Sequence, residues 1–213
     1  MKSPHVVSPE LSAFLAVQMD VLGDLALRLG DDSGALKWRR QAAELADRMY
    51  HKLFRNDLPI PIDADTGDPI ICESLLPYLS LLASDFLPKS CTEKMRDVIL
   101  NRDYLTPYGF ASEKVTSPEY LEDGYWCGAV WPPVALLLVD ALDSLGEREM
   151  AKEAAAAYCT TVEQNGFSEN YSSRTGHGLR DRAYTWAASV WILLTEYVHR
   201  ETETSFGHTV QGC

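Results

Sequence analysis

Apolar residues recur along most of the chain at steps of three and four residues, which is the spacing of amphipathic helices. The pattern predicts one helix over residues 8–29 and a second over about 33–54. Ser8 suits the N-cap of the first helix, Pro9 suits its first turn, and Gly30 ends it. The same pattern predicts five further helices, over residues 73–84, 92–100, 134–145, 147–164 and 182–199.

The apolar positions of the first two predicted helices fall on one face of each helix. In the first helix this face consists of Leu11, Phe14, Leu15, Leu22, Leu25, Ala26 and Leu29. In the second helix the predicted buried stripe is Ala42, Leu45, Ala46, Met49, Tyr50, Leu53 and Phe54. The remaining segments are predicted to be a loop or short hairpin over 56–72, an irregular stretch over 101–128, a glycine-containing loop over 165–179 and a frayed tail after 202.

A weak internal repeat links the two ends of the chain. In both copies an apolar helix ends in Leu-Gly, at Gly30 and at Gly146, and an alanine-rich helix with a charged face follows. Repeated helical hairpins predict a toroid or solenoid in which the more apolar helix of each pair lines the inside. No Pro/Gly/Ser-rich linker divides the chain, so we expect a single helical domain over residues 1–213.

Composition excludes several classes of function. Lys plus Arg is 19 and Asp plus Glu is 31, so the net charge is −12, which disfavours a nucleic-acid partner. The longest apolar stretches, over 129–139 and 183–195, are shorter than the roughly 18–20 residues needed to cross a membrane. The N-terminal residues lack the apolar region of a signal peptide, so the sequence predicts neither a membrane partner nor secretion.

The cysteines and histidines suggest no metal site or disulfide framework. The five cysteines are odd in number, widely spaced and without a C-x-x-C pair, which favours free thiols in a reducing, cytoplasmic setting. The histidines lack ligand spacing, and no Gly-rich phosphate loop or serine-nucleophile motif is present. We therefore expect no metal and no organic cofactor.

The first loop with candidate chemistry covers residues 122–133, at the start of an apolar helix. It contains Tyr125, Trp126, Gly128 and Trp131. Aromatic faces stack on the C–H faces of sugar rings, and glycine lets the backbone approach a ligand closely. The alternative is that these aromatics only pack the loop onto the core, which composition by itself favours.

The second such loop covers residues 166–178 and contains a single carboxylate, Glu169. A carboxylate placed beside aromatic and amide groups could activate a water molecule as a general base. The alternative is an ordinary solvated loop glutamate, which the loop composition by itself favours.

Taken in order, these segments resemble the (α/α)6-barrel glycoside hydrolases of family 63 and their relatives. That group includes mannosylglycerate hydrolase-like enzymes, processing α-glucosidases and, more distantly, trehalases. Residues 125–132, Tyr-Trp-Cys-Gly-Ala-Val-Trp-Pro, resemble the Tyr-Trp-Arg-Gly-Pro-Val/Ile-Trp-Pro segment of the family. Residues 166–178 resemble its Gly-Phe-x-Glu-x-Tyr-x-x-x-Thr-Gly-x-Gly motif, and Trp186 lies in the Trp-Ala-Ala segment that follows.

The resemblance implies an inverting α-glycosidase in which Glu169 is the general base. It also implies a sugar-contacting wall made of Tyr125, Trp126, Trp131 and Trp186, with Gly128 allowing close approach. The general acid of the family is an Asp earlier in the chain, and no counterpart is found here, so the chain resembles the C-terminal half of a barrel. We expect the other loop carboxylates to be solvated charges; they are Glu113, Glu119, Glu122 and Asp123.

Two residues depart from the family pattern. Cys127 stands where the family has Arg and Ala129 where it has Pro, and loss of the cation would weaken hydrogen bonding to sugar hydroxyls or carboxylates. Three alternatives follow: part of a glycosidase, a half-barrel completed by a second chain (a copy of itself or a complementary half), or a non-catalytic carbohydrate-binding or structural module.

Overall fold

The computed structural model describes residues 5–200, which contain seven helices and four two-stranded sheets. The predicted tail after residue 202 lies outside this range. The chain forms two compact units, one of residues 1–72 with 76–97 and the other of residues 73–75 with 98–213. The single domain expected over 1–213 stays a prediction, and the two units are described separately.

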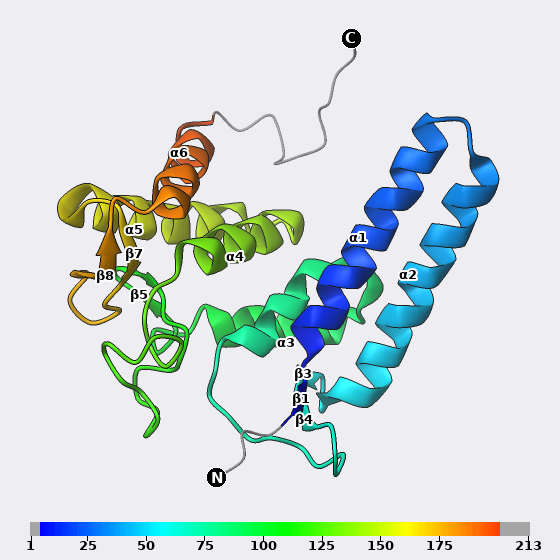
Figure 1. Ribbon diagram of the computed structural model, residues 1–213, viewed down its shortest axis with the longest axis horizontal. Coiled ribbons are helices and arrows are strands. Elements are labelled where there is room, and N and C mark those ends of the chain that lie inside the picture. The colour runs from blue at the N-terminus through cyan, green and yellow to red at the C-terminus, as the bar shows by residue number, and fades with distance from the viewer. Residues whose placement is uncertain (1–4, 201–213) are drawn as a thin grey trace. The chain divides into compact units, whose positions relative to one another are not determined.

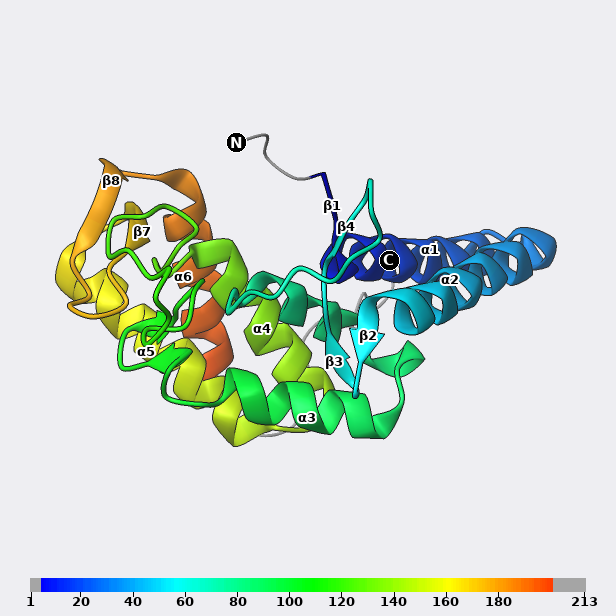
Figure 2. The ribbon, with the colours of Figure 1, turned by 90° about the horizontal axis from the view of Figure 1, so that it is seen from below.

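The first unit is built on a hairpin of two long helices, α1 (Pro9–Arg28) and α2 (Asp32–Leu53), which lie side by side in Figures 1 and 2. As predicted, Ser8 is the N-cap of α1, although its side chain hydrogen-bonds Glu10 and no backbone amide. Small residues allow α1 to approach α2 closely: a Cβ added at Gly23 would come within 2.9 Å of the Arg39 side chain. The predicted stripe of α2 is confirmed in part, and its buried residues are Ala35, Ala42, Ala46, Met49 and Leu53.

The buried side of α1 is not the apolar face that the sequence predicts. The buried residues of α1 are Pro9, Ala13, Ala16 and Gly23, which lie on the other side of the helix. The leucines of the predicted face are exposed, at positions 11, 15, 22, 25 and 29. Small side chains occupy the buried side of α1, which packs on α2 and on the segment over residues 76–86, because they let the backbones come close.

The Leu-Gly repeat corresponds to the same helix-ending turn in both units. Gly30 and Gly146 have φ of 78° and 80°, a left-handed conformation that glycine adopts without strain. In each turn the amide after the glycine bonds a carbonyl five residues back, at 2.9 Å from Asp31 to Ala26 and 3.0 Å from Glu147 to Leu142. This is the Schellman motif, which satisfies the last helical carbonyls and sends the chain back as a hairpin.

Short strands and a tight helix complete the first unit. β1 (Val6–Val7) pairs with β4 (Ile62–Asp63), and β2 (Phe54–Arg55) pairs with β3 (Leu58–Pro59), which confirms a hairpin within the loop predicted over 56–72. The next segment is η1 (Leu76–Phe86), and α3 (Lys89–Ile99) follows it and ends in the second unit.

The helix predicted over 73–84 is wrong in its start and its type. Residues 73–75 are extended, because Leu75 donates its amide to the Ser112 carbonyl at 2.9 Å and Lys114 donates to the Glu73 carbonyl at 3.1 Å. The helix η1 that follows is of the 3-10 type and contains a non-helical residue, Ala83. Pairing with a segment forty residues away overrides the local helical pattern here.

The second unit is a group of three helices, α4 (Pro132–Ser144), α5 (Arg148–Asn165) and α6 (Thr185–His199), shown together in Figure 1. Two tyrosines tie them together: Tyr158 donates to the Ala187 carbonyl at 3.2 Å, and Tyr197 donates to the Asp143 carboxylate at 2.8 Å. Burial raises the pKa of both phenols, which therefore stay protonated donors.

Two hairpins are attached to these helices. β5 (Leu105–Thr106) pairs with β6 (Gly109–Phe110), and β7 (Ser168–Tyr171) pairs with β8 (Gly178–Arg182). The loop predicted over 165–179 is thus a hairpin, and the final helix begins at Thr185 and not at 182. None of the helices within residues 5–200 is both long and apolar enough to span a membrane.

Candidate functional site

Three segments that are distant in sequence lie side by side in the second unit. Val130 forms isolated bridges to Ala111 on one side and to Tyr171 on the other. Its amide donates to the Tyr171 carbonyl at 2.8 Å, and the Tyr171 amide donates back at 3.0 Å. The aromatic loop over 122–133 is therefore held directly beside β7, the strand that contains Glu169.

The aromatic candidates form one cluster. Trp126 stacks on Trp131 with ring centroids 4.1 Å apart and planes 12° from parallel, while Trp186 meets Trp131 edge-on at 5.7 Å. Tyr125 also meets Trp131 edge-on, at 4.8 Å, and Tyr184 packs against Trp186 at 4.7 Å. Four of the residues predicted for the wall are thus brought together, and Tyr184 is a member that sequence reasoning missed.

Members of the cluster differ in exposure. Trp131 is fully buried, at the N-cap of α4, whereas Trp126 and Trp186 are half-buried and Tyr125 is exposed. Trp131 contacts the rings of Tyr125, Trp126 and Trp186 while it is itself shielded from solvent. Its predicted contact with sugar stays a prediction, and the surface that a ligand could touch is formed by the other three rings.

Gly128 is buried, and close packing within its own loop explains why glycine is required at this position. Its φ is 151°, and an added Cβ would come within 2.6 Å of the Tyr120 ring and 2.9 Å of the Leu121 carbonyl oxygen. A side chain at this position would push the loop apart. Its predicted role in close approach to a ligand remains a prediction.

Tyr125 has a φ of 61°, which is rare for a bulky side chain and costs about 1–3 kcal/mol. The strain is held in place by the Trp131 indole, which donates to the Tyr125 carbonyl at 3.1 Å. Strained residues of this kind concentrate at ligand sites. Sequence alone gives no sign of this conformation, because nothing in the local residues requires it.

Glu169 lies on β7 opposite a bulge in β8. Ser168 pairs with Arg182 and Asn170 pairs with Leu179, so the single residue Glu169 faces two residues on the other strand. One of those two is Arg180, whose φ is 60°. Bulges are over-represented next to active sites, where they redirect a side chain.

The carboxylate of Glu169 is available for chemistry. It is half-buried and has no hydrogen bond or ion pair with any residue in the range 5–200. Its backbone is nevertheless anchored, since the Trp186 indole donates to its carbonyl at 2.9 Å. The nearby arginines are engaged elsewhere: Arg180 pairs with Asp123 at 2.8 Å, and Arg174 donates to the Val115 carbonyl at 3.0 Å.

Glu122 and Asp123 clamp the aromatic loop to the β7–β8 hairpin. Glu122 accepts hydrogen bonds from the hydroxyls of Ser172 at 2.6 Å and Thr175 at 3.3 Å. The Arg180 guanidinium bonds both the carboxylate and the carbonyl of Asp123, at 2.8 and 2.9 Å. Both are exposed, as expected of loop charges, but each also has a partner on the neighbouring hairpin that sequence spacing does not reveal.

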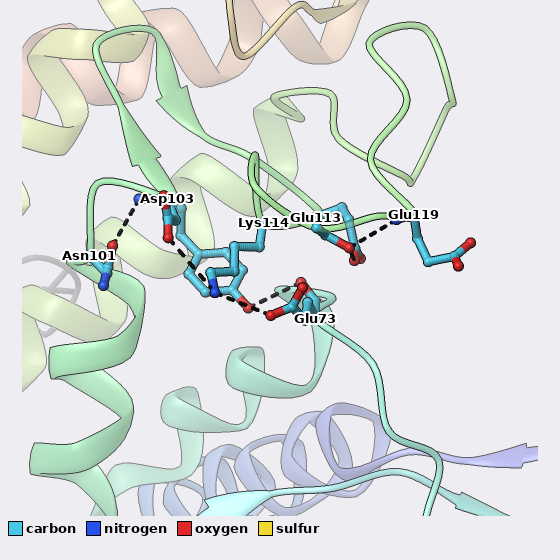
Figure 3. A network of polar contacts seen from close by, with 8 residues as sticks. Glu73, Asn101, Asp103, Glu113, Lys114 and Glu119 are labelled. Atoms are coloured by element: carbon cyan, nitrogen blue, oxygen red, sulfur yellow. Dashed lines mark hydrogen bonds and ion pairs between the residues drawn. The ribbon is translucent and has the colours of Figure 1, made fainter.

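Glu113 also departs from its predicted role as a solvated charge. It is buried and accepts a hydrogen bond from the Ser117 hydroxyl at 2.6 Å. Burial, with smaller contributions from Glu73 and Glu119, raises the pKa of the Glu113 carboxyl. Figure 3 shows Glu113 next to Lys114, which donates a hydrogen bond to Glu73 at 3.1 Å, while the Glu119 carboxylate points away from the network.

The raised pKa of Glu113 predicts a pH-dependent stability. The folded state holds the proton more tightly than the unfolded state, so the contribution of Glu113 is greatest below its ordinary pKa of about 4.5 and falls as pH rises. Relative to the unmodified chain, Glu113→Gln is therefore expected to become more stable as pH goes from 4 to 7. Urea unfolding at both pH values measures this, with Glu196→Gln on the exposed face of α6 as control. An E113Q difference that does not change with pH would contradict the assignment.

The residue types that commonly bind metals are dispersed in the part of the chain that the structure describes. Among the residues described, no three His, Cys, Asp or Glu side chains are grouped as a metal site. Cys72, Cys91, Cys127 and Cys159 are free thiols, and Cys127 is exposed beside Trp126 in the chain; Cys213 lies outside the described range.

Comparison with known proteins identifies the family. Residues 1–187 match the model of the mannosylglycerate hydrolase MGH1-like glycoside hydrolase domain. A curated relative, the mannosylglycerate hydrolase of Thermus thermophilus, is 29% identical over 92 residues, which is 43% of this chain and 21% of that protein.

Solved structures support the same fold. The family 63 mannosylglycerate hydrolase of Thermus thermophilus, in complex with Tris, superposes with a TM-score of 0.78 at 23% identity, over 89% of this chain and 45% of that one. The neutral trehalase of Saccharomyces cerevisiae superposes with a TM-score of 0.68 at 14% identity, over 90% of this chain and 38% of that one. The chain thus has the all-α fold of these (α/α)6 barrels and spans less than half the length of the relatives.

The match over residues 1–187 covers most of the chain and includes both the aromatic loop and β7. The order of the two motifs, the helical hairpins and the superpositions all agree with it. The chain therefore belongs to the MGH1-like family of glycoside hydrolase domains, of which it contains about one half of the barrel.

Proposed function

We propose that this chain supplies the base-containing half of an inverting α-glycoside hydrolase acting on an α-linked mannosyl or glucosyl glycoside. Glu169 is the general base, which deprotonates the water that attacks the anomeric carbon. Tyr125, Trp126 and Trp186 form the wall on which the sugar ring stacks. The Thermus relative is a mannosylglycerate hydrolase and has been solved with glucose and with D-glycerate, which supports a small glycoside as substrate class.

The single observation that carries the proposal is the state of the Glu169 carboxylate. It is half-buried, unpaired among the residues described, and anchored through its backbone to the half-buried Trp186. An inverting site needs a second carboxyl about 6.5–9.5 Å away, with the attacking water between the two. Glu122 and Asp123 form hydrogen bonds to the β7–β8 hairpin, and Glu113 accepts a hydrogen bond from Ser117. We therefore assign the general acid to the half of the barrel that the chain does not span.

The identity of residue 127 affects which glycosides the proposed site would bind. The family has Arg at this position, and a guanidinium binds a carboxylate with two parallel hydrogen bonds. The exposed thiol of Cys127 cannot do so. We therefore propose a preference for a neutral glycoside over one with an anionic aglycone.

The test is titration of the chain with methyl α-mannoside, methyl α-glucoside and the cation Tris, followed by a crystal structure with the tightest binder. We expect sugar between Trp126 and Glu169. Trp126→Ala should weaken binding at least about tenfold through loss of stacking and of the wall. Trp38→Phe, on α2 in the first unit, is the matched control and should leave binding unchanged.

The outcomes separate the alternatives. Binding to Trp126 and Glu169, with hydrolysis once a second carboxyl is supplied, supports the hydrolase. Binding without hydrolysis in the completed barrel would mean a carbohydrate-binding module. If none of the three ligands binds and Trp126→Ala changes nothing, the site assignment is wrong and only the fold remains.

A further inference from the structure

Arg180 combines a strained backbone with a two-point contact made by its side chain. It lies on β8 with a φ of 60°, a left-handed conformation that is strained for arginine. The side chain is 41% exposed, and its Nε lies 2.8 Å from the Asp123 carboxylate while Nη2 donates to the Asp123 carbonyl at 2.9 Å. Ion pairs as exposed as this one contribute little to stability, so stability does not explain a strained arginine at this position.

The segment that this arginine contacts is a compact loop from Leu121 to Cys127. Three backbone hydrogen bonds close the loop. Leu121 donates to the Cys127 carbonyl at 2.8 Å, Cys127 donates to the Gly124 carbonyl at 3.2 Å, and Gly124 donates to the Leu121 carbonyl at 3.0 Å. The loop contains both Asp123 and Trp126. Because these bonds are internal to the loop, a contact made at Asp123 also fixes the position of Trp126.

The other end of the contact lies opposite the proposed base. Glu169 faces two β8 residues at the bulge, Arg180 and Asp181. A second tether of the loop, made by Glu122, reaches the turn between β7 and β8 instead. Arg180 is therefore the tether that joins the loop containing Trp126 to the part of the hairpin at Glu169.

We propose that Arg180 is a positioning residue, which sets the spacing between the aromatic wall and the Glu169 carboxylate. It acts through Asp123 and contacts neither the sugar nor the attacking water. Salt screens an exposed ion pair, so the tether weakens as ionic strength rises. The inference rests on the proposed function for the roles of Trp126 and Glu169, whereas the tether itself can be measured without a sugar.

Hydrogen exchange of the free chain tests the tether. Arg180→Gly should unfold at the same or a higher urea concentration, because glycine adopts the left-handed conformation without strain. The amides of Leu121 and Cys127 should nevertheless exchange at least about threefold faster in this variant. Raising the salt concentration from about 0.01 M to about 1 M should speed the same exchange in the unmodified chain but not in Arg180→Gly.

Arg182→Gln is the matched control for hydrogen exchange. Arg182 is an exposed arginine on the same strand, and it has no ion pair or side-chain hydrogen bond within residues 5–200. This variant should keep the slow exchange and its dependence on salt. Equal exchange in Arg180→Gly and Arg182→Gln would overturn the proposal.

Titration with methyl α-mannoside tests the positioning role. Arg180→Gly should weaken binding about threefold to tenfold at low salt, and the difference from the unmodified chain should disappear at high salt. Arg180→Lys keeps a cation at this position and should restore most of the affinity and its dependence on salt.

The outcomes distinguish this inference from the proposed function. Equal sugar affinity of the unmodified chain and Arg180→Gly would overturn the positioning role and leave the proposed function standing. No binding of sugar by the unmodified chain would refute the proposed function and the positioning role together, even where exchange shows that Arg180 holds the loop.

Discussion

Replacement of Glu169 by Gln is expected to lower hydrolysis of an α-linked glycoside by roughly 10²–10⁴-fold, the usual contribution of a general base. The amide keeps the shape of the side chain but cannot accept the proton of the attacking water. The assay follows release of the free sugar by this chain mixed with the part of the Thermus mannosylglycerate hydrolase that this chain does not cover, expressed as a separate polypeptide. Sugar affinity should change little for a neutral glycoside, because the aromatic wall is untouched.

The chain alone provides a second measurement. Tris is a cation, and the unpaired Glu169 carboxylate is the group that would bind it, so E169Q should weaken Tris binding by about tenfold or more. Glu163→Gln, an exposed position on α5, is the matched control for both assays. Unchanged Tris affinity in E169Q, or equal hydrolysis by both variants, would rule out Glu169 as the base.

Replacement of Trp131 by Ala is expected to lower the free energy of unfolding by about 3–5 kcal/mol, as for other buried aromatic residues. Trp131 is fully buried, stacks on Trp126 and meets Tyr125 and Trp186 edge-on. The variant loses these contacts and also the indole donor that holds the strained Tyr125 carbonyl. Urea unfolding followed by far-ultraviolet circular dichroism measures the change.

The stability loss expected for Trp131→Ala can be compared with that for Ala at the half-buried Trp186. Trp186→Ala should cost less stability, because less apolar surface is buried there, while it also removes the indole bond to the Glu169 carbonyl. If Trp131→Ala abolished sugar binding without loss of stability, Trp131 would be a contact residue and not the support of the cluster.

Local sequence signals were enough to predict most of the helices and the turns between them. The start of α1 at Pro9 and the two Leu-Gly turns at Gly30 and Gly146 follow from capping and from the left-handed preference of glycine. These depend on interactions within about five residues, so the residues themselves encode them. The order of the two motifs likewise indicated the family before any contact was known.

The sequence named the residues of the candidate site but did not predict how they are arranged. The sequence places Glu169, Trp126 and Trp186 in recognisable motifs, yet the bridges of Val130 to Ala111 and Tyr171 bring them together. The partners of Glu122 and Asp123 are about fifty residues away, in the β7–β8 hairpin. The sequence of this hairpin predicts a loop, because its strands are short and a bulge interrupts their pairing.

The sequence by itself determined an all-α chain of helical hairpins, since helix periodicity and capping are local properties. Only the tertiary structure decided that Glu113 is buried, that Trp131 is fully buried, and that Ala13 and Ala16 rather than the predicted leucines are buried on α1. Burial depends on which distant part of the chain packs against a side chain. Hydrophobic periodicity indicates that a helix face is apolar but does not identify the surface that packs against it.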